Sequence, residues 1–381
     1  MPSDSPVTSR KSSVPSPHSI ARVDLSAISR NYRYLCGRAQ GAEVMPVVKA
    51  DAYGHGAPAV SRRLESEGAR RFAVAGTAEG LDLRRAGLSA RIHLLNASDP
   101  SEAALHRAYG LIPALYDPAQ AAAFAQAAAP LPEPLPVHLK IDTGMGRLGF
   151  RPEDLGEAIA LLRSARGLRL EGVFTNLAAA DEPGSPATAR QLSAFRDCLA
   201  TLRAAGLSPG LVHVSNSAGV LSWPDARFDA VRPGLALYGV PPSESMADDA
   251  LEPAMTLESR VLSVRRIPEG TPLGYGGRFT TERASTIAVV PLGYHDGIRR
   301  ALSGRAAWIL RGTKAPIVGA VSMDLTLLDA TETGVEPGDR VICLGRDGEL
   351  RVTAWDLARA AGTIPWEILC GIGPRVPRVH A

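Results

Sequence analysis

The sequence predicts an α/β fold, a (β/α)8 barrel of the TIM type followed by a smaller, mostly-β C-terminal domain. From residue 21 onward, short β-branched runs alternate with longer stretches of helical periodicity. Eight such runs occur within about 200 residues, and each parallel strand needs a crossover helix to reach the next one. After about residue 250, short Val/Ile/Leu runs between Gly and Pro turns indicate a mostly-β domain.

The eight β-branched runs supply the expected barrel strands. In chain order they cover residues 43–49, 71–76, 91–96, 111–116, 137–142, 170–176, 211–216 and 230–238. A doubly wound parallel sheet is the alternative architecture, and it would normally carry a Gly-rich phosphate loop after its first strand. The first run here leads into KADAYGHG, which lacks the GxGxxG order, so the barrel is favoured.

Helical stretches separate these runs. They cover residues 57–68, 77–87, 101–109, 118–129, 152–166 and 190–206. Several open with a candidate cap or first-turn proline, namely Thr77, Ser101, Pro118 and Pro152.

The C-terminal third is expected to hold strands and one helix. Strands are predicted over residues 285–292, 306–310, 315–321 and 339–344, and Thr353 would cap a helix over 353–361. Residues 1–19 are rich in Ser and Pro and are expected to form a disordered tail. The expected domains are therefore the barrel over 20–250 and the C-terminal domain over 251–381.

Composition and charge argue against several classes of protein. The chain has 381 residues and no apolar run long enough to cross a bilayer, so a membrane protein is not expected. The net charge is +3 and Lys and Arg are spread along the chain, which disfavours a nucleic-acid partner. Four widely spaced cysteines without a CxxC pair predict neither a zinc site nor a disulfide framework. The first 19 residues lack the apolar region of a secretory signal, so a cytoplasmic protein is expected, with a transit peptide as the alternative.

Chemistry in such barrels gathers at the carboxyl ends of the strands, and Lys49 lies at the end of the first run. Burial lowers the pKa of a lysine because the charged form loses its hydration, and a neutral amine can form a Schiff base. The alternative is a lysine whose ammonium group reaches solvent at the barrel rim.

The ends of later runs carry further polar residues and a glycine. They are Arg147, Asn176, Asn216, Ser217, Arg232 and Gly234. Barrels often bind phosphate with the loops after strands seven and eight, where Ser217 and the Gly234 backbone can donate hydrogen bonds. A Schiff-base lysine together with such a phosphate site implies pyridoxal 5'-phosphate. Taken singly, Ser217 can equally be a helix cap, Gly234 a packing glycine and Arg232 an ion-paired core residue.

Lys140 lies in the fifth run, VHLKID, on the same face of the strand as His138 and Asp142. If this face is the barrel interior, the charge of Lys140 needs an explanation. An ion pair with Asp142 is the default prediction. The alternative is chemical modification of Lys140 to an anion that can hold Arg147.

A series of motifs spans nearly the whole chain, from Ala21 to Arg378. The motifs are VKADAYGHG at 48–56, LKIDTGMGRLG at 139–149, HVSNSA at 213–218, VRPG at 231–234, YG at 275–276, GYHDG at 293–297, SMD at 322–324 and RVPR at 375–378. In this order they closely resemble the alanine racemases, a family of pyridoxal-phosphate enzymes built from a (β/α)8 barrel and a β-rich C-terminal domain.

This resemblance implies racemisation of L-alanine and D-alanine by two bases. Lys49 would hold the cofactor and act as the base on one face of the α-carbon, and Tyr275 of the partner subunit would act on the other face. The resemblance therefore implies a homodimer with shared active sites. The D-alanine that it makes would supply bacterial peptidoglycan synthesis.

The resemblance also implies roles for neighbouring residues. Arg232 would face the pyridine nitrogen of the cofactor and keep it unprotonated, because an arginine does not give up its own proton. Arg147, held by Lys140, would contact the cofactor and the substrate carboxylate, and Lys140 is carbamylated in many relatives. The other implied contacts are Met323 and Tyr294 for the substrate, and Tyr53, Asn216, Ser217, Gly234 and Leu235 for the cofactor.

Two positions depart from the family pattern. Asn176 stands where the family usually has a histidine stacked on the cofactor ring, and Pro374 where many relatives have a tyrosine at the pocket entrance. A racemase of broader amino-acid specificity is therefore the alternative function. A non-catalytic pyridoxal-phosphate protein, which would lack the second domain, and a decarboxylase, which would want an acidic partner for the pyridine nitrogen, are two further alternatives.

Overall fold

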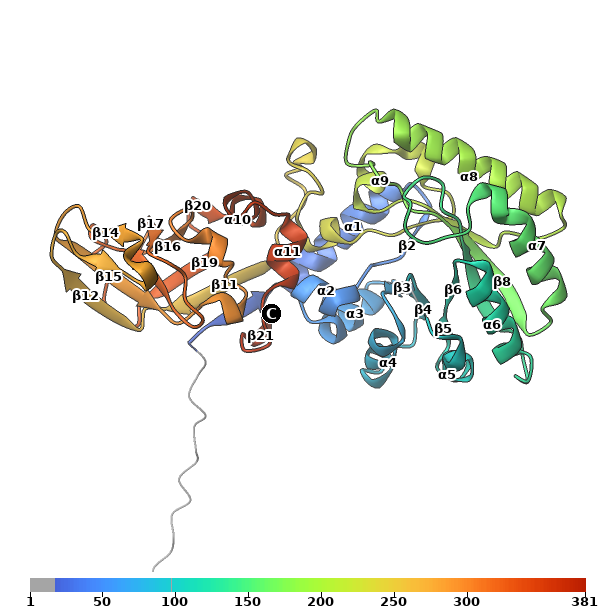
Figure 1. The fold of residues 1–381 in the computed structure, drawn as a ribbon, viewed down its shortest axis with the longest axis horizontal. Helices are drawn as coiled ribbons and strands as arrows, with labels where there is room; N and C mark the ends of the chain where they lie inside the picture. The colour runs from blue at the N-terminus through green and yellow to red at the C-terminus, as the bar shows by residue number, and fades with distance from the viewer. Residues whose placement is uncertain (1–17, 97) are drawn as a thin grey trace, which may run out of the picture.

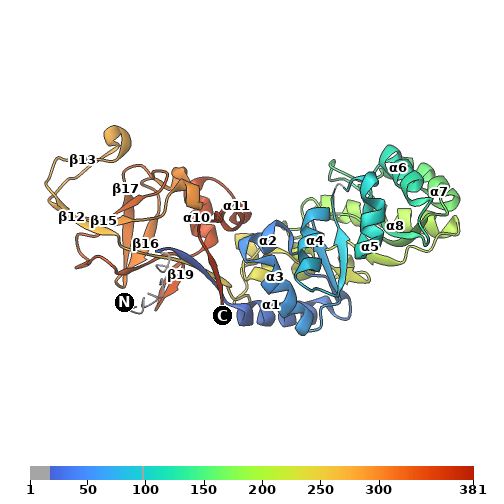
Figure 2. The ribbon, with the colours of Figure 1, turned by 90° about the horizontal axis from the view of Figure 1, so that it is seen from below.

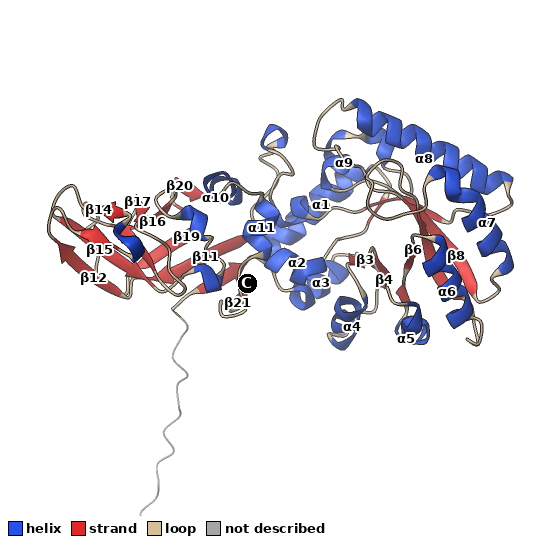
Figure 3. Cartoon of the chain, in the orientation of Figure 1, coloured by secondary structure: helices blue, strands red, loops and turns tan. Residues whose placement is uncertain are grey.

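The computed structural model describes residues 18–96 and 98–381. Two domains lie end to end, one with strands surrounded by helices and the other built mostly of strands (Figures 1 and 3). The tail expected at residues 1–19 falls mainly on residues 1–17, which lie outside the described part of the chain. Among the helices of the described residues, none is long and apolar enough to span a membrane.

Parallel strands close into the expected barrel. β10 hydrogen-bonds to both β9 and β2, and a parallel bridge between Val47 and Ala73 joins the continuation of β2 to β3. β5 and β6 are two halves of one run that Pro113 interrupts, since proline has no N–H to donate. In chain order the strands are β2 (Glu43–Val44), β3 (Arg71–Val74), β4 (Arg91–Leu94), β5 (Leu111–Ile112), β6 (Ala114–Leu115), β7 (Leu135–Lys140), β8 (Leu168–Phe174), β9 (Leu211–His213) and β10 (Ala230–Val231). Each of the eight predicted runs thus contributes a strand to the ring.

The eighth run is a strand only at its start, which corrects the extended segment expected over residues 230–238. β10 ends at Val231, and a short 3-10 helix forms at Leu235–Tyr238. Pro233 cannot donate a ladder hydrogen bond, and the chain turns at Gly234. This turn places the Gly234 backbone at the carboxyl end of the barrel.

Helices cover the outside of the barrel (Figure 3). α6 begins at the predicted Pro118, directly after Asp117, whose side chain accepts a hydrogen bond from Gln120 N. The helices are α1 (Leu25–Ala39), α3 (Ala57–Ser66), α4 (Thr77–Arg85), α5 (Ala103–Tyr109), α6 (Pro118–Ala128), α7 (Leu155–Ser164), α8 (Pro186–Ala204) and α9 (Ser217–Ser222).

Two of the expected helix caps are wrong. Gly76, not Thr77, precedes the first residue of α4, and the Thr77 hydroxyl bonds Glu102 and His106 instead. Ser101 is not a cap either, because Asp99 caps the 3-10 turn that leads into α5. The Asp99 side chain accepts a hydrogen bond from Ser101 N, so the cap lies two residues before the predicted position.

The C-terminal domain is a mostly antiparallel sheet with two helices against it. Its strands follow the order β12-β15-β18-β17-β16-β19-β11-β1-β21, and β20 pairs with β19. The strands are β1 (Ile20–Val23), β11 (Met255–Arg260), β12 (Ser263–Ile267), β15 (Ser285–Val290), β16 (Ala307–Leu310), β17 (Thr313–Val318), β18 (Thr326–Asp329), β19 (Arg340–Asp347), β20 (Leu350–Val352) and β21 (Arg378–His380). The helices are α10 (Ala354–Ala361), which Thr353 caps as predicted, and α11 (Pro365–Cys370).

The first strand of the described chain lies in the C-terminal sheet. Residues 20–23, within the range expected for the barrel, form β1, which pairs antiparallel with β11 and parallel with β21. The chain enters the barrel only after this strand, through α1. Strands near both ends of the chain therefore fasten the two domains to each other.

Candidate active site

Lys49 stands where the continuation of β2 ends and a left-handed segment, α2 (Lys49–Gly54), begins. Residues 50–53 all have φ between 52° and 55° and ψ between 41° and 50°. Left-handed backbone costs an L-residue roughly 1–2 kcal/mol, so the surrounding structure must hold this segment in place. Sequence reasoning missed the segment, because residues 50–53 include no glycine that would signal it.

Hydrogen bonds fix the backbone next to Lys49. Ala50 N donates to Glu79 Oε1 at 2.8 Å, and Ala52 N donates to Val48 O at 2.8 Å. Asp51 Oδ1 accepts from Ala57 N at 2.7 Å, at the start of α3. The backbone from which the Lys49 side chain extends is thus strained and well bonded.

The C-terminal domain braces the residues that follow this segment. A Cβ atom on Gly54 would lie 2.4 Å from Leu369 O in α11, so only glycine fits there. Arg378 Nε donates to Gly54 O at 2.9 Å, and His380 Nε2 lies 2.8 Å from His55 O. The RVPR motif thereby ties the C-terminal strand to the Lys49 loop.

The surroundings of Lys49 favour its neutral amine. Burial lowers the pKa of Lys49, and the nearby positive charge of Arg147 lowers it further, while Glu79 opposes both effects. The expected lowering of the Lys49 pKa is therefore confirmed.

Tyr53, Ser217 and Gly234 meet at one place at the carboxyl end of the barrel. The Ser217 hydroxyl accepts hydrogen bonds from Gly234 N at 2.9 Å and Ala236 N at 3.2 Å. A Cβ atom on Gly234 would lie 2.4 Å from the Tyr53 hydroxyl, so the missing side chain gives this phenol room. Burial raises the pKa of Tyr53, which keeps the phenol protonated as a donor. These hydroxyl groups form a cradle of the kind that an anion needs.

The helix cap beside this cradle is Asn216, not Ser217. Asn216 Oδ1 accepts from Gly219 N at 3.0 Å, and Ser217 is the first residue of α9. The reading of Ser217 as a helix cap is therefore wrong. Leu235 begins the 3-10 helix that follows Gly234 and is buried beside the cradle.

Arg232 is buried at the end of β10, where protein acceptors surround its guanidinium group. Nη2 donates to Thr175 O, Asn176 Oδ1 and Val214 O at 2.8, 2.6 and 3.0 Å, and Nη1 lies 2.5 Å from His213 Nδ1. Burial lowers the pKa of Arg232 to about 9, which leaves it charged at neutral pH.

The reading of Arg232 as an ion-paired core residue is wrong within the described part of the chain, where no carboxylate lies within ion-pair distance of it. Its acceptors are uncharged carbonyl, amide and imidazole groups. Among the described residues, the Nε–H group has no protein acceptor and remains available to a ligand.

The predicted ion pair between Lys140 and Asp142 is not formed. Lys140 Nζ donates to Leu95 O at 3.3 Å and lies 5.5 Å from the centre of the Phe174 ring. Burial and the charges of Arg147 and Arg232 lower the pKa of Lys140 to about 8. Lys140 thus faces the barrel interior without a carboxylate partner among the described residues.

Asp142 is occupied by the backbone of the loop that carries Arg147. Its carboxylate accepts N–H groups from Gly144, Met145, Gly146 and Arg147 at 2.7 to 3.1 Å. Burial of Asp142 acts to raise its pKa, but these four hydrogen bonds hold the pKa below its ordinary value. The Arg147 side chain is exposed at the mouth of the barrel.

The remaining candidate residues lie on the C-terminal domain and are exposed. The exposed fractions of Tyr275, Met323 and Tyr294 are 73%, 52% and 44%. A cavity of about 360 Å³ is lined by Tyr275, Ser322, Leu325 and their neighbours, so residues 275 and 322–325 share one surface. Figure 2 places β13 (Pro272–Leu273), which leads into Tyr275, at the far end of the C-terminal domain from α2, the segment that begins at Lys49. Within one chain, the structure does not bring Tyr275 and Lys49 together.

Ion pairs hold the loop that carries Met323. Arg375 donates to both oxygens of the buried Asp296 at 2.9 and 3.0 Å, and it pairs with Asp324 at 2.8 Å. A Cβ atom on Gly293 would lie 2.2 Å from Met323 O, which explains this glycine of the GYHDG motif.

Pro374, next to Arg375, is exposed.

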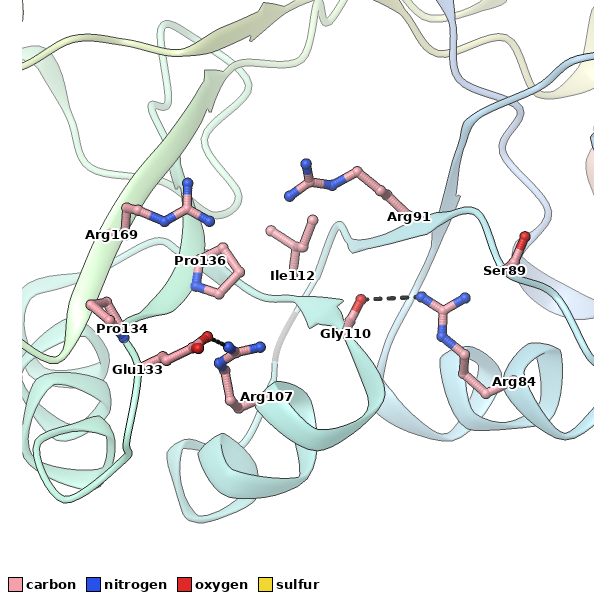
Figure 4. A pocket seen from close by; sticks show the side chains of 10 residues that line it. All are labelled: Arg84, Ser89, Arg91, Arg107, Gly110, Ile112, Glu133, Pro134, Pro136 and Arg169. Carbon is pink, nitrogen blue, oxygen red and sulfur yellow. Dashed lines mark hydrogen bonds and ion pairs between the residues drawn. The ribbon is translucent and has the colours of Figure 1, made fainter.

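A second cavity, of about 370 Å³, opens at the amino ends of the strands, opposite Lys49 (Figure 4). Arginines dominate its lining, but each is already bonded within the protein. Arg91 and Arg169 share Glu171, and Arg107 pairs with Glu133. Arg84 donates to backbone carbonyl groups, including Leu88 O at 2.6 Å. Among the described residues each of these arginines is thus held by protein acceptors, but the lining keeps an excess of positive charge, because Arg91 and Arg169 share one carboxylate and the hydrogen bonds of Arg84 go to carbonyl groups.

Family models match almost all of the described chain. The model described as "Alanine racemase, N-terminal domain" matches residues 23–242, and "Alanine racemase, C-terminal domain" matches residues 254–380. The alanine racemase of Carboxydothermus hydrogenoformans is 41% identical over 363 residues, 94% of this chain and 98% of that protein. That of Symbiobacterium thermophilum is 42% identical over 362 residues, 94% and 96% of the two chains.

Solved structures agree with the sequence relatives. Alanine racemase from Streptomyces lavendulae superposes with a TM-score of 0.92 at 36% identity, covering 96% of this chain and 97% of that one. Alanine racemase from Bacillus anthracis with bound L-Ala-P superposes with a TM-score of 0.91 at 33% identity, covering 96% and 95%. Fold, motifs and relatives lead to one conclusion: the chain belongs to the alanine racemase family and is an isomerase of that family.

Proposed function

We propose that this enzyme interconverts L-alanine and D-alanine with pyridoxal 5'-phosphate as its cofactor, using Lys49 and Tyr275 of the partner subunit as two bases. One observation carries the proposal: the half-buried Lys49 amine, whose pKa is lowered, lies at the same end of the barrel as the hydroxyl cradle and Arg232. Alanine is proposed as the substrate because the relatives are named alanine racemase.

The residues at the barrel mouth fit this cofactor. Ser217 and Tyr53 would hold its phosphate group through their hydroxyl groups, and the Gly234 N–H group, which donates to the Ser217 hydroxyl in this structure, would turn to the phosphate, since hydroxyl and amide donors suit a dianion. Arg232 would direct its Nε–H group to the pyridine nitrogen. Asn216 and Leu235 flank the cradle and complete its wall.

Bound pyridoxal phosphate would withdraw electrons from the substrate α-carbon and so make the α-proton acidic. Lys49 Nζ, whose pKa burial and the charge of Arg147 lower, would take or return this proton on one face. Tyr275 Oη of the partner subunit would return or take it on the other face. Racemisation follows because a proton removed from one side is replaced from the opposite side.

The site would be completed by a second copy of the chain. β13, which leads into Tyr275, lies far from α2, which begins at Lys49 (Figure 2). Tyr275 and Met323 are both exposed on the C-terminal domain, and Tyr275 lines one cavity with Ser322 and Leu325, on either side of Met323. A homodimer that places this surface over the partner's barrel mouth would bring the second base, the Met323 backbone and Tyr294 to the substrate. The substrate carboxylate would then meet the Met323 amide and the exposed Arg147.

Lys140 is proposed to be carbamylated. Its lowered pKa, near 8, supplies the neutral amine that attacks carbon dioxide, and the reaction forms an N–C bond and releases one proton. The resulting anion would attract the positive charges of Arg147 and Arg232, both of which now act to lower the pKa of Lys140. We further propose that the enzyme works in the cytoplasm and supplies D-alanine for peptidoglycan.

A proton NMR experiment tests the proposed function. L-Alanine is incubated in D2O with purified protein and added pyridoxal phosphate, and the product is resolved by a chiral assay. Loss of the α-proton signal together with D-alanine would support both proton transfer and racemisation. Exchange without D-alanine would mean that one base acts alone, and no exchange with any amino acid would favour a non-catalytic cofactor-binding protein.

A racemase of broader amino-acid specificity is the second candidate. Pro374 favours it, because this exposed position lacks the tyrosine that narrows the entrance in many relatives. Turnover of alanine, serine and lysine under the same conditions separates the two. A preference for a larger side chain would overturn the alanine assignment.

A further inference from the structure

Three buried histidines lie together in the barrel interior beside Arg232. They are His93 on β4, His138 on β7 and His213 on β9, and each is at most 2% exposed. The ring centres of His93 and His138 are 4.5 Å apart, and those of His138 and His213 are 5.0 Å apart. We call these three side chains the histidine column.

Hydrogen bonds run from Arg232 into this column and fix where the protons lie. Arg232 can only donate, so its Nη1–H group donates to His213 Nδ1, which must carry no proton. A neutral His213 then carries its proton on Nε2 and donates it to His138 Nδ1 at 2.8 Å. The donor order is therefore Arg232, His213, His138.

The surroundings keep the column uncharged. Burial, together with the charges of Arg71, Arg91 and Arg232, lowers the pKa of His138 to about 3. Burial and the charge of Arg232 hold the pKa of His213 far below its ordinary value. A protonated His213 would place two donors against each other, so only the neutral form is compatible with the Arg232 bond.

The backbone makes room for His138. A Cβ atom on Gly172, in β8, would lie 2.5 Å from His138 Cε1 and 2.6 Å from Nε2. The pairing of β7 with β8 also shifts register between Val137 and His138. The same Cβ atom would lie 2.6 Å from Leu211 O, so Gly172 makes room for the β9 backbone as well as for the His138 ring.

We propose that His138 is a positioning residue for the reaction: by accepting the His213 N–H group it fixes the His213 tautomer, which holds the Arg232 guanidinium with its Nε–H group toward the site. Without an acceptor at residue 138, His213 either buries an unbonded N–H group or turns its proton against Arg232. Each outcome loses a hydrogen bond, worth about 0.5–1.5 kcal/mol. The effect on the reaction rests on the proposed function, whereas the effect on the His213 tautomer does not.

His93 provides a matched control. It is as buried as His138 and touches the same ring, but neither of its nitrogens has a hydrogen-bond partner among the described residues. His93→Phe therefore perturbs the packing of the column without removing a link in the donor order. His138→Phe removes the acceptor, and His138→Asn restores it, because an Asn Oδ1 atom can accept where histidine Nδ1 did.

The first measurement is histidine 15N NMR of the full chain without cofactor, with the His213 signals assigned by their loss in His213→Gln. We expect His213 to be protonated on Nε2 alone in the wild type, His93→Phe and His138→Asn, and to lose this single-tautomer pattern in His138→Phe. Circular dichroism checks that each variant is folded. A wild-type pattern in His138→Phe, or an equal change in His93→Phe, would overturn the proposal.

The second measurement uses the holoenzyme and compares pyruvate formed by transamination with alanine racemised. We expect this ratio to rise about two- to tenfold in His138→Phe, the range of one hydrogen bond, and to stay at the wild-type value in His138→Asn and His93→Phe. A ratio that does not change in His138→Phe would contradict the positioning role. If the wild type itself does not racemise alanine, the proposed function fails while the NMR result still decides the tautomer.

Discussion

The two parts of the proposed site differ in how firmly the chain holds them. On the barrel, Lys49, Ser217 and Arg232 lie at strand ends, where backbone hydrogen bonds, a strained left-handed segment and the C-terminal strand fix their positions. On the C-terminal domain, Tyr275 is 73% exposed and is flanked by Gly274 and Gly276, both with positive φ. Under the proposed function, one chain would build the cofactor half of a site and present the second half to another copy.

The largest expected effect comes from the barrel half. Lys49→Ala removes the cofactor lysine and one base together, and we expect racemisation to fall by at least about a thousandfold, since a single general base contributes about 10²–10⁴-fold. Thermal unfolding should stay near that of the wild type, because the replaced amine forms no hydrogen bond among the described residues. Residual activity within tenfold of the wild type would contradict the assignment.

The two halves should also differ in their effect on stability. Arg232→Ala leaves buried acceptors at residues 175, 176, 213 and 214 without their donor, and we expect it to lower the free energy of unfolding by about 3–5 kcal/mol. Tyr275→Phe, at an exposed position, should change it by no more than about 0.5 kcal/mol. Urea unfolding of both variants measures these changes. If the two variants lost the same free energy of unfolding, the proposed difference between the two halves would be contradicted.

Much of the barrel could be predicted from the sequence, because hydrophobic periodicity and strand-end residues are local signals. The eight runs, the position of Lys49 and the helix that Thr353 caps all follow from patterns within a few residues. The partner of Lys140 could not be predicted, because Asp142 is bound by the backbone of residues 144–147, a feature of loop geometry. The left-handed segment at 50–53 also depends on distant contacts, since Leu369 and Arg378 brace the glycine that follows it.

Carbamylation of Lys140 should depend on pH in a defined direction. The folded chain lowers the pKa of Lys140 to about 8, so the reactive neutral amine becomes the major form above pH 8 and is lost as the pH falls below it. At a fixed pressure of 13C-labelled carbon dioxide, the carbamate signal in 13C NMR should therefore grow as the pH rises from 7 to 9. Lys140→Met should abolish the signal, and an unchanged spectrum in that variant would place the carbamate elsewhere.

The smallest expected effect concerns the entrance. Pro374→Tyr adds a large ring at an exposed position beside Arg375. If the wider entrance admits larger amino acids, this variant should lower kcat/KM for lysine relative to alanine by about 10-fold, the scale of a modest steric change in a pocket. Pro374→Ala is the control and should keep the wild-type ratio. A ratio that is the same in all three proteins would separate Pro374 from substrate selection.

The shared site, the central claim, is tested most directly by mixing two inactive variants. Lys49→Ala and Tyr275→Phe are dissociated, mixed in equal amounts and reassociated, with heterodimers counted by two affinity tags. Half of the dimers would be mixed and one of their two sites would join an intact Lys49 to an intact Tyr275, so about a quarter of the wild-type activity should return. If verified heterodimers stay as inactive as the two parents, the bases do not come from different subunits and the account is wrong.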